Sequence, residues 1–439
     1  MSGRFDTFVR GLDEDAVRSV RASTLRVFNA RSSTLGEVFE DVDDARRAAA
    51  SVKSYVLENL KALLLQFEEN CARNGVTVHW AEDAASANAT ILGICARVAP
   101  GGATVVKAKS MATEEIHLNK HLTEAGHTPI ETDLGEFVVQ IDGDTPSHIV
   151  APIIHKDRRQ IARSFEREGL GPYTEEPEEL TMQARAHLRE KFKSAEVGVS
   201  GVNFAVASTG RIVIVENEGN NRLCTTAPRV HIALMGIEKL LPDESDLALF
   251  LRLLAGSATG QRLTVYTHFI TGPRRAEGDG PEEVHLVLLD NGRSRVLNGP
   301  YRDILRCIRC GACLNACPVY RRSTGHAYRH VYPGPVGAVL APALEGVKKL
   351  GALAKASSLC GECKEVCPVD IPIPDMLLRL RSEDERNREN KWKWFAFGAQ
   401  NPMFWRAGVR LMRMPRAWRE FRNPPRRQND FRRWWRGRP

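Results

Sequence analysis

The sequence lacks the features that identify three common classes of protein. No apolar run approaches the roughly 18 residues that a membrane-spanning helix needs. No G-x-G-x-x-G motif follows a predicted strand and no G-x-x-x-x-G-K-[ST] motif occurs, so dinucleotide sites and P-loop nucleotide sites have no support. The N-terminal segment contains Asp6, Asp13, Glu14 and Asp15 but no apolar stretch, which argues against a secretory signal and predicts a cytoplasmic protein.

Cysteine is scarce outside one segment of the 439 residues. Seven of the ten cysteines lie between Cys307 and Cys367, and the other three, Cys71, Cys95 and Cys224, are isolated. We expect these three to be small buried residues, because free cysteine is among the most buried residue types. In a reducing compartment, the seven clustered cysteines would serve as ligands or nucleophiles rather than form disulfides.

Excess positive charge is confined to the C-terminal end. Residues 386–439 contain 16 Lys and Arg against 3 Asp and Glu, which gives them a net charge of +13. Because the net charge of the whole chain is +8, residues 1–385 have a net charge of −5. This basic tail also contains six of the seven tryptophans. Three interpretations are open: the tail wraps around a partner subunit, rests on an anionic membrane surface, or forms a solvated end. No recognition module accompanies the charge, so we expect no nucleic-acid binding.

The remaining chain divides into three regions. Residues 1–70 are predicted to be helical, because 44–70 are rich in Ala, Leu, Lys and Glu with apolar residues at helical spacing. Short β-branched runs then alternate with helical stretches over 71–290, which predicts an α/β fold with a mostly parallel sheet. The predicted strands are 76–80, 104–106, 137–141, 149–154, 211–215, 263–270 and 284–289, and the predicted helices are 111–125, 157–168, 181–193, 229–241 and 244–254. The cysteine-rich third region, 291–385, has a predicted helix over 336–356.

The first cysteine segment along the chain has the spacing of a bacterial ferredoxin. In CIRCGACLNACP, three cysteines follow one another at x2 spacing, and a fourth comes after three more residues and precedes Pro318. Three thiolates on a tight loop can reach three corners of one iron–sulfur cubane. The fourth, which the proline helps to turn away, would then ligate the other cluster.

The second cysteine segment, CGECKEVCP, repeats this pattern without its first cysteine. Ser357 occupies the position of the missing cysteine. Crossed ligation predicts two ligand sets: Cys307, Cys310, Cys313 and Cys367 for cluster 1, and Cys317, Cys360 and Cys363 for cluster 2. Cluster 1 is then a [4Fe–4S] cluster. Cluster 2 has three thiolates and is either a [3Fe–4S] cluster or a [4Fe–4S] cluster whose fourth ligand is Ser357, water or a residue of a partner.

Zinc explains this arrangement less well than iron and sulfur do. Structural zinc sites typically use two cysteine pairs a dozen or more residues apart, which gives no reason for a third cysteine at x2 spacing. Two adjacent clusters would form a one-electron relay. The sequence therefore predicts an electron carrier rather than a catalyst of bond chemistry, and it assigns no catalytic residue.

Two polar stretches follow predicted strands in the α/β region. One, VVKAKSMATEEI, contains Lys107, Lys109 and Ser110, and the other, IVIVENEGNNRL, begins its polar part at Glu216. Each stretch is either an anion-binding loop or an ordinary combination of helix cap and turn. The histidines of this region, His117, His121, His155 and His231, show no metal-like clustering and are expected to have packing roles.

Several stretches together resemble the lactate utilisation protein B family, the iron–sulfur member of a bacterial three-protein system that oxidises L-lactate. The resemblance covers nearly the whole chain and is carried by VKAKSMATEEI, GVNFAVASTGRIVIVENEGNNRL, PRVHIALMGIEKL, CIRCGACLNACPVYRRSTGHAY, YPGPVGAVLAP and SSLCGECKEVCPVDIPI. It implies a lactate-utilisation domain with a fold like that of ribose-phosphate isomerases and CoA-transferases, followed by an α-helical ferredoxin domain. It also implies two iron–sulfur clusters on the seven cysteines above. The implied partners are a cysteine-rich-domain subunit and a second lactate-utilisation-domain subunit, and the implied role is electron carriage during oxidation of L-lactate to pyruvate.

Two alternatives remain at this point. The chain could carry electrons for another 2-hydroxy-acid dehydrogenase. In a different functional class, it could be a CoA-transferase-like enzyme or binding module with structural or sensory clusters. Glu216-Asn217 loosely resembles the sequence around the nucleophilic glutamate at a strand end of CoA-transferases.

Overall fold

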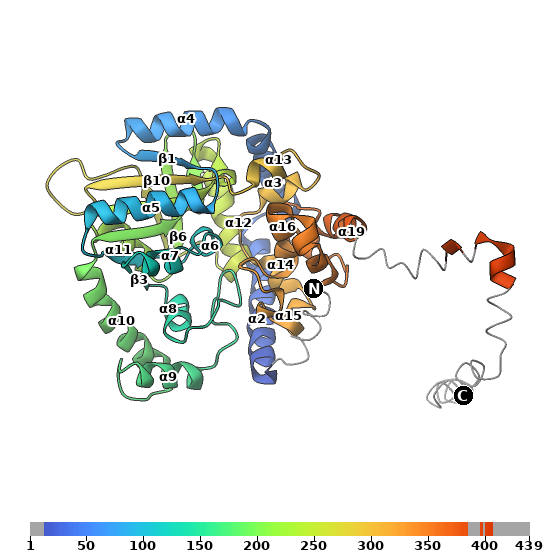
Figure 1. Ribbon diagram of the computed structural model, residues 1–439, viewed down its shortest axis with the longest axis horizontal. Coiled ribbons are helices and arrows are strands. Elements are labelled where there is room, and N and C mark those ends of the chain that lie inside the picture. Colours follow the sequence, from blue (N-terminus) through green and yellow to red (C-terminus); the bar gives the residue numbers. More distant parts are fainter. Residues whose placement is uncertain (1–12, 385–395, 398–399, 407–439) are drawn as a thin grey trace. The chain divides into compact units, whose positions relative to one another are not determined.

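The computed structural model describes residues 13–384, 396–397 and 400–406 (Figure 1). The chain divides into two compact units, Met1–Glu383 and Asp384–Pro439. Within the second unit, residues 402–406 are helical and Trp405 is exposed. The other tryptophans of the basic tail lie outside the described residues: Trp392, Trp394, Trp418, Trp434 and Trp435.

The first unit is built on a sheet of six parallel strands. Their order is β1 (Thr77–Ala81), β10 (Glu283–Leu289), β7 (Val230–Gly236), β4 (Val197–Gly201), β2 (Thr104–Lys107) and β3 (Thr128–Glu131). Every residue of β7 is buried, as expected for a central strand of a parallel sheet that is covered on both faces. The mostly parallel sheet predicted for this region is confirmed.

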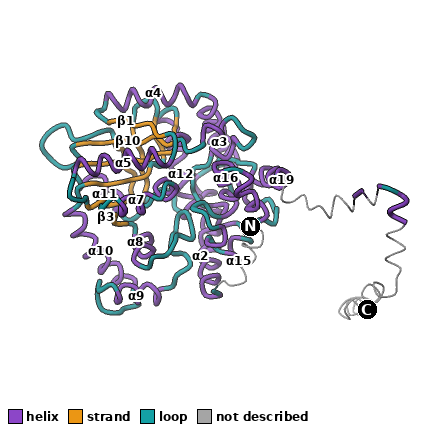
Figure 2. Tube along the Cα trace, in the orientation of Figure 1, coloured by secondary structure: helices purple, strands orange, loops and turns teal. Residues whose placement is uncertain are grey.

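A second sheet of four strands lies in the same region. Its order is β8 (Leu240–Leu241), β5 (Phe204–Val206), β6 (Arg211–Glu216) and β9 (Tyr266–Ile270). The β6 strand pairs antiparallel with both β5 and β9. Figure 2 shows that the strands occupy one part of this unit, whereas helices and loops make up the rest.

Helices surround the sheets and form the cysteine-rich region. Those of the α/β region are α4 (Leu60–Arg73), α5 (Ala84–Val98), α6 (Met111–Glu115), α7 (Leu118–Glu124), α8 (Leu134–Ile141), α9 (Arg158–Arg167), α10 (Pro177–Ser194), α11 (Asn220–Thr226) and α12 (Leu247–Thr259). Those after β10 are α13 (Arg293–Leu297), α14 (Ala312–Ala316), α15 (Tyr320–Ser323), α16 (Gly334–Glu345), α17 (Val347–Leu350), α18 (Glu362–Glu365) and α19 (Ile373–Glu383). None of the helices in the described ranges is both long and apolar enough to cross a bilayer.

The two N-terminal helices join the α/β region to the cysteine-rich region. These helices, α2 (Glu14–Val38) and α3 (Val42–Glu58), both pack against α12, and α2 also packs against α14 and α15. Both begin at an aspartate, because Asp13 and Asp41 accept hydrogen bonds from backbone N–H groups of their first turns. The continuous helix predicted over 44–70 is interrupted at Asn59, where α3 ends and α4 follows.

Three other sequence predictions were wrong. Residues 229–241, predicted as a helix, contain the strand β7, because a short and mostly apolar run that is buried on both faces has no periodicity that separates a strand from a helix. Residues 137–141, predicted as a strand, belong to α8, whose first turn is capped by Asp133. Residues 149–154 form bends and turns rather than a strand.

Candidate iron–sulfur centre

The structure brings four of the seven clustered cysteines together around one cavity. Cys307, Cys310, Cys313 and Cys367 all line it, and its other lining residues are mostly aliphatic, including Ile149, Ile308, Val336 and Ile371. Three of the thiols are buried, and Cys307 is partly buried. These four cysteines are the set that crossed ligation assigns to cluster 1.

The surroundings of these four thiols suit sulfur atoms bound to a cation. Burial and the neighbouring Cys307 raise the pKa of Cys310 to about 12, so a set of free thiolates here would be unfavourable. Iron ions would supply the missing positive charge, since a coordinating thiol is deprotonated. The backbone N–H groups of Arg309 and Ile371 donate hydrogen bonds to the Sγ atoms of Cys307 and Cys367, each at 3.4 Å. The donor set therefore fits an iron–sulfur cluster.

The other three cysteines form a second group beside the first. Burial, followed by the proximity of Cys317 and Cys360, raises the pKa of Cys363 to about 12. The backbone N–H of Tyr320 donates to Cys317 Sγ at 3.5 Å. Cys317 and Cys363 are buried whereas Cys360 is exposed, so the second group reaches the protein surface.

Arginines from the N-terminal helices hold the second cysteine segment in place. Arg31 of α2 donates to the carbonyl oxygen of Val366 at 2.9 Å. Arg46 of α3 donates to the carbonyl oxygens of Cys367 at 2.8 Å and Lys364 at 2.9 Å. Helices α2 and α3, within the region predicted to be helical, thus fix the backbone at and beside Cys367, a proposed ligand.

We expect Arg46→Ala to lower the free energy of unfolding by roughly 2 kcal/mol, because it removes two hydrogen bonds from a charged donor. Arg47→Ala is the matched control, because Arg47 is exposed and pairs with Asp44 on the same helix. The control should cost less than about 0.5 kcal/mol. Urea unfolding of both variants measures the difference, and equal losses would show that Arg46 has no special role.

A buried ion network joins the α/β region to the first cysteine segment. Glu238 accepts hydrogen bonds from Arg293 at 2.7 Å and from Arg309 at 3.1 Å. Arg293 also pairs with Glu115 at 2.8 Å, and Tyr332 donates to the same carboxylate. Burial alone would raise the pKa of Glu238, but the two arginines lower it to about 2. Sequence reasoning missed this network, since its members are scattered and form no motif.

A cavity of about 390 Å³ lies at the carboxyl ends of β2, β4 and β7. This is where the strand order reverses, and ligands of parallel α/β sheets bind at such points. Gly236, Lys239 and Arg309 are among its lining residues. Burial and the adjacent Arg309 lower the pKa of Lys239 to about 8. The cavity therefore lies beside Arg309, one of the two residues between Cys307 and Cys310.

The first polar stretch serves packing and capping. Lys107 is buried and pairs with Glu131 at 2.7 Å and Glu114 at 3.1 Å, and Lys109 pairs with Glu136 at 3.1 Å. Ser110 caps α6. Both lysines are therefore already neutralised by carboxylates of the protein, and the capping interpretation is confirmed.

The second polar stretch has a similar role. Glu216 accepts hydrogen bonds from the backbone N–H groups of Asn221 at 2.8 Å and Arg222 at 2.9 Å, and its carboxylate lies 2.6 Å from His268 Nε2. Both carboxylate oxygens of Glu216 thus accept hydrogen bonds from the first turn of α11. A carboxylate engaged in this way gives no support to the CoA-transferase alternative.

The isolated cysteines behave as expected. Cys71, Cys95 and Cys224 are fully buried, each in an apolar cluster, and Cys224 also contacts the hydroxyl of Thr132 at 3.2 Å. Burial raises the pKa of each of the three thiols to about 12, which keeps them neutral.

One histidine departs from its expected packing role. His155 lies 3.0 Å from Asp144, and one ligand atom from each of Asp144, His155 and His326 falls within 4.8 Å of the others. The Lys156 ammonium lies 2.9 Å from the same aspartate and already provides a counter-charge there. His231 is buried and pairs with Ser200 at 2.8 Å.

Comparisons with known proteins agree with this architecture. Residues 64–289 match the LUD domain and residues 303–371 match the 4Fe-4S dicluster domain. The uncharacterized electron transport protein YkgF of Escherichia coli (strain K12) is 45% identical over 92% of this chain and 86% of its own length. Lactate utilization protein B of Shouchella clausii (strain KSM-K16) is 42% identical over the same shares. Lactate utilization protein B of Bacillus subtilis (strain 168) is 44% identical over 85% of this chain and 78% of its own.

These matches cover both the α/β region and the cysteine-rich region, and they extend over most of the chain. The chain therefore belongs to the lactate utilization protein B family.

Proposed function

We propose that this chain carries electrons during the oxidation of L-lactate to pyruvate, as the iron–sulfur subunit of a complex. The observation that carries the proposal is the convergence of seven cysteines into two neighbouring groups. When bound there, two iron–sulfur clusters would supply one-electron redox chemistry. L-lactate loses two electrons and two protons on becoming pyruvate, which matches two adjacent one-electron sites.

The chain's own residues suit this role. Ile149, Ile308 and Val336 exclude water around the first cysteine group, and backbone N–H groups directed at sulfur stabilise its negative charge. Cys360 lies at the surface, so the second group is the one that an electron-transfer partner can approach. The two groups thus offer a buried end and an exposed end for electron passage.

We propose two partners, a cysteine-rich-domain subunit and a second lactate-utilisation-domain subunit, acting with this chain in the cytoplasm. The exposed Cys360 leaves the second cysteine group open to contact with another protein. The basic tail, 386–439, is proposed as a docking segment, with contact to an anionic membrane surface as the alternative. Nucleic acid is not among the proposed partners.

The test is anaerobic co-purification with both partners, followed by EPR spectroscopy after addition of L-lactate. We expect L-lactate to reduce the iron–sulfur signals and pyruvate to appear, with D-lactate as the matched control. Reversible reduction and reoxidation without loss of iron would distinguish a carrier from structural or sensory clusters. Signals that respond to dithionite but not to L-lactate in the complete complex would contradict the proposed substrate. Reduction by a different 2-hydroxy acid alone would favour another dehydrogenase.

A further inference from the structure

The two cysteine segments share one backbone conformation. Arg309 and Gly311, on either side of the second cysteine of the first segment, have φ angles of 62° and 76°. Leu359 and Gly361, on either side of Cys360, have φ angles of 56° and 92°. A short helix, α14 or α18, follows each glycine. Positive φ is unfavourable for arginine and leucine, so its occurrence at matching positions identifies the same loop in both segments.

Ser357 occupies the place in the second loop that Cys307 occupies in the first. Each lies three residues before the cysteine that begins the Cys-Gly pair. The backbone N–H of Arg309 donates to Cys307 Sγ at 3.4 Å, and the backbone N–H of Leu359 donates to Ser357 Oγ at 3.1 Å. The serine oxygen therefore replaces a sulfur in an otherwise repeated loop.

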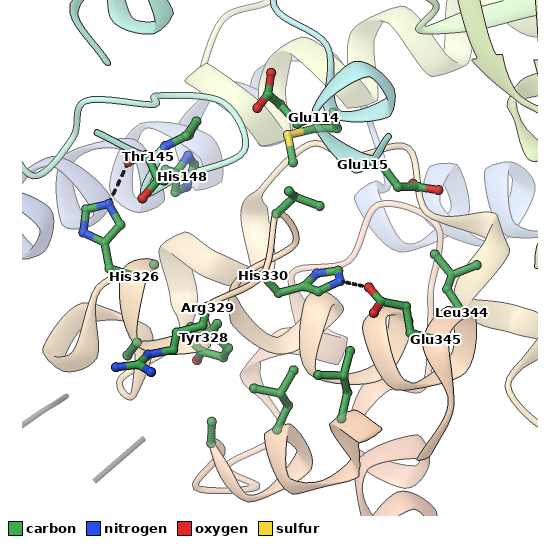
Figure 3. A pocket seen from close by; sticks show the side chains of 18 of the residues that line it. Glu114, Glu115, Thr145, His148, His326, Tyr328, Arg329, His330, Leu344 and Glu345 are labelled. Atoms are coloured by element: carbon green, nitrogen blue, oxygen red, sulfur yellow. Dashed lines mark hydrogen bonds and ion pairs between the residues drawn. The ribbon is translucent and has the colours of Figure 1, made fainter. Parts of the chain in front are cut away.

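The loop that contains Ser357 borders a cavity of about 1320 Å³, here called the large cavity. Ala356, Ser357 and Ser358 form part of its wall, together with Val319, which follows Cys317 by two residues. Figure 3 shows His326, His330, Glu114 and Glu345 around the same space. The side of the second cysteine group that lacks a thiol thus faces a space large enough for a small molecule and the water around it.

The charges on the wall of the large cavity favour an anion. Its four carboxylates already have cationic or histidine partners: Glu114 with Lys107, Glu115 with Arg293, Asp144 with Lys156, and Glu345 with His330 and Lys349. Lys355, two residues before Ser357, also lines the cavity and has no ion pair within the part of the chain that the structure describes. A negatively charged ligand would find an available cation beside the serine.

We propose that Ser357 leaves one iron of the second cluster without a protein ligand, and that a small carboxylate binds that iron through the large cavity. A 2-hydroxy acid or a 2-oxo acid is the ligand class, because it offers two oxygen donors and a negative charge. This inference rests on the proposed function, since it requires the second cluster. It adds a ligand-binding site to a subunit otherwise assigned only electron carriage.

Substitution at Ser357 tests the coordination directly. Anaerobic oxidation of the wild-type chain with ferricyanide should remove one electron from the second cluster, release one Fe²⁺ and give a [3Fe–4S] EPR signal. Ferrous iron added together with a thiol reductant, which returns the electron, should remove that signal by rebuilding the [4Fe–4S] cluster. Ser357→Cys should supply the missing thiolate and abolish this signal at unchanged total cluster content. Ser357→Ala should behave as the wild type. If Ser357→Ala loses iron more readily than the wild type, the serine oxygen is itself a ligand and the proposal is wrong.

The matched control is Ser358→Cys, which places a thiol in the same cavity wall one residue away and should leave the signal as in the wild type. Carboxylate binding is then tested with lactate and pyruvate labelled with ¹⁷O. Broadening of the reduced second-cluster signal in the wild type but not in Ser357→Cys supports the proposal. No broadening in either protein, or equal broadening in both, overturns it. Absence of iron and sulfide from every preparation would instead contradict the proposed function.

Discussion

Replacing Cys310 by serine should remove the cluster 1 signal, lower the iron content by about half, and leave the cluster 2 signal in place. The reason is that Cys310 lines the cavity of the first cysteine group together with Cys307, Cys313 and Cys367. Cys363→Ser should have the reverse effect, because Cys363 lies with Cys317 and Cys360 in the second cysteine group. Iron analysis and EPR spectroscopy of anaerobically prepared protein measure both effects.

Cys95→Ser serves as the control for the loss of a buried thiol, since Cys95 lies in an apolar cluster of the α/β region. It should leave both signals unchanged. The crossed assignment would be wrong if Cys310→Ser and Cys363→Ser abolished the same signal. It would also be wrong if Cys317→Ser affected cluster 1 rather than cluster 2, because the assignment depends on the fourth cysteine serving the second group.

Replacing Glu238 by glutamine should lower the free energy of unfolding by roughly 3–5 kcal/mol, the usual cost of removing one partner from a buried ion network. The substitution leaves Arg309 without its carboxylate and Arg293 with Glu115 as its remaining one. The pH dependence follows from the pKa of Glu238, which the two arginines lower from 4.5 to about 2. The stabilisation is therefore complete above pH 4.5 and is lost as the pH falls toward 2.

Glu37→Gln is the matched control, because Glu37 also pairs with an arginine, Arg262, but both side chains are exposed. This pair should contribute less than about 1 kcal/mol. Denaturant unfolding at neutral pH compares the two variants. A loss for Glu238→Gln no larger than for Glu37→Gln would show that the buried network does not hold the two regions together.

The cysteine groups could be predicted because ligand spacing along the chain is local information. Cys307, Cys310 and Cys313 share one loop, so their convergence requires no knowledge of the fold. The partners from the second segment followed from the ferredoxin pattern, and the structure brings Cys367 to the first group as that pattern requires. The parallel sheet was predicted for a similar reason, since strands that alternate with helices leave a pattern in sequence.

The contacts that connect the regions could not be predicted in this way. Glu238 and Arg309 are far apart in sequence. The cysteine spacing around Arg309 predicts metal ligands but not the carboxylate with which this arginine pairs. Likewise, nothing in the sequence around Arg46 indicates that it binds the carbonyl oxygen of Cys367. Even local structure was misjudged for β7, because burial on both faces removes the alternation that identifies a strand. Long-range pairing of isolated charges and burial on two faces are properties of the folded chain.

The most direct test of the central claim is a redox titration of the anaerobically isolated chain, monitored by EPR spectroscopy and accompanied by iron, sulfide and zinc analysis. The account predicts iron with matching acid-labile sulfide, and two distinct centres that each take up one electron reversibly. A preparation that contains zinc in place of iron, or a single centre that requires all seven cysteines, would contradict it.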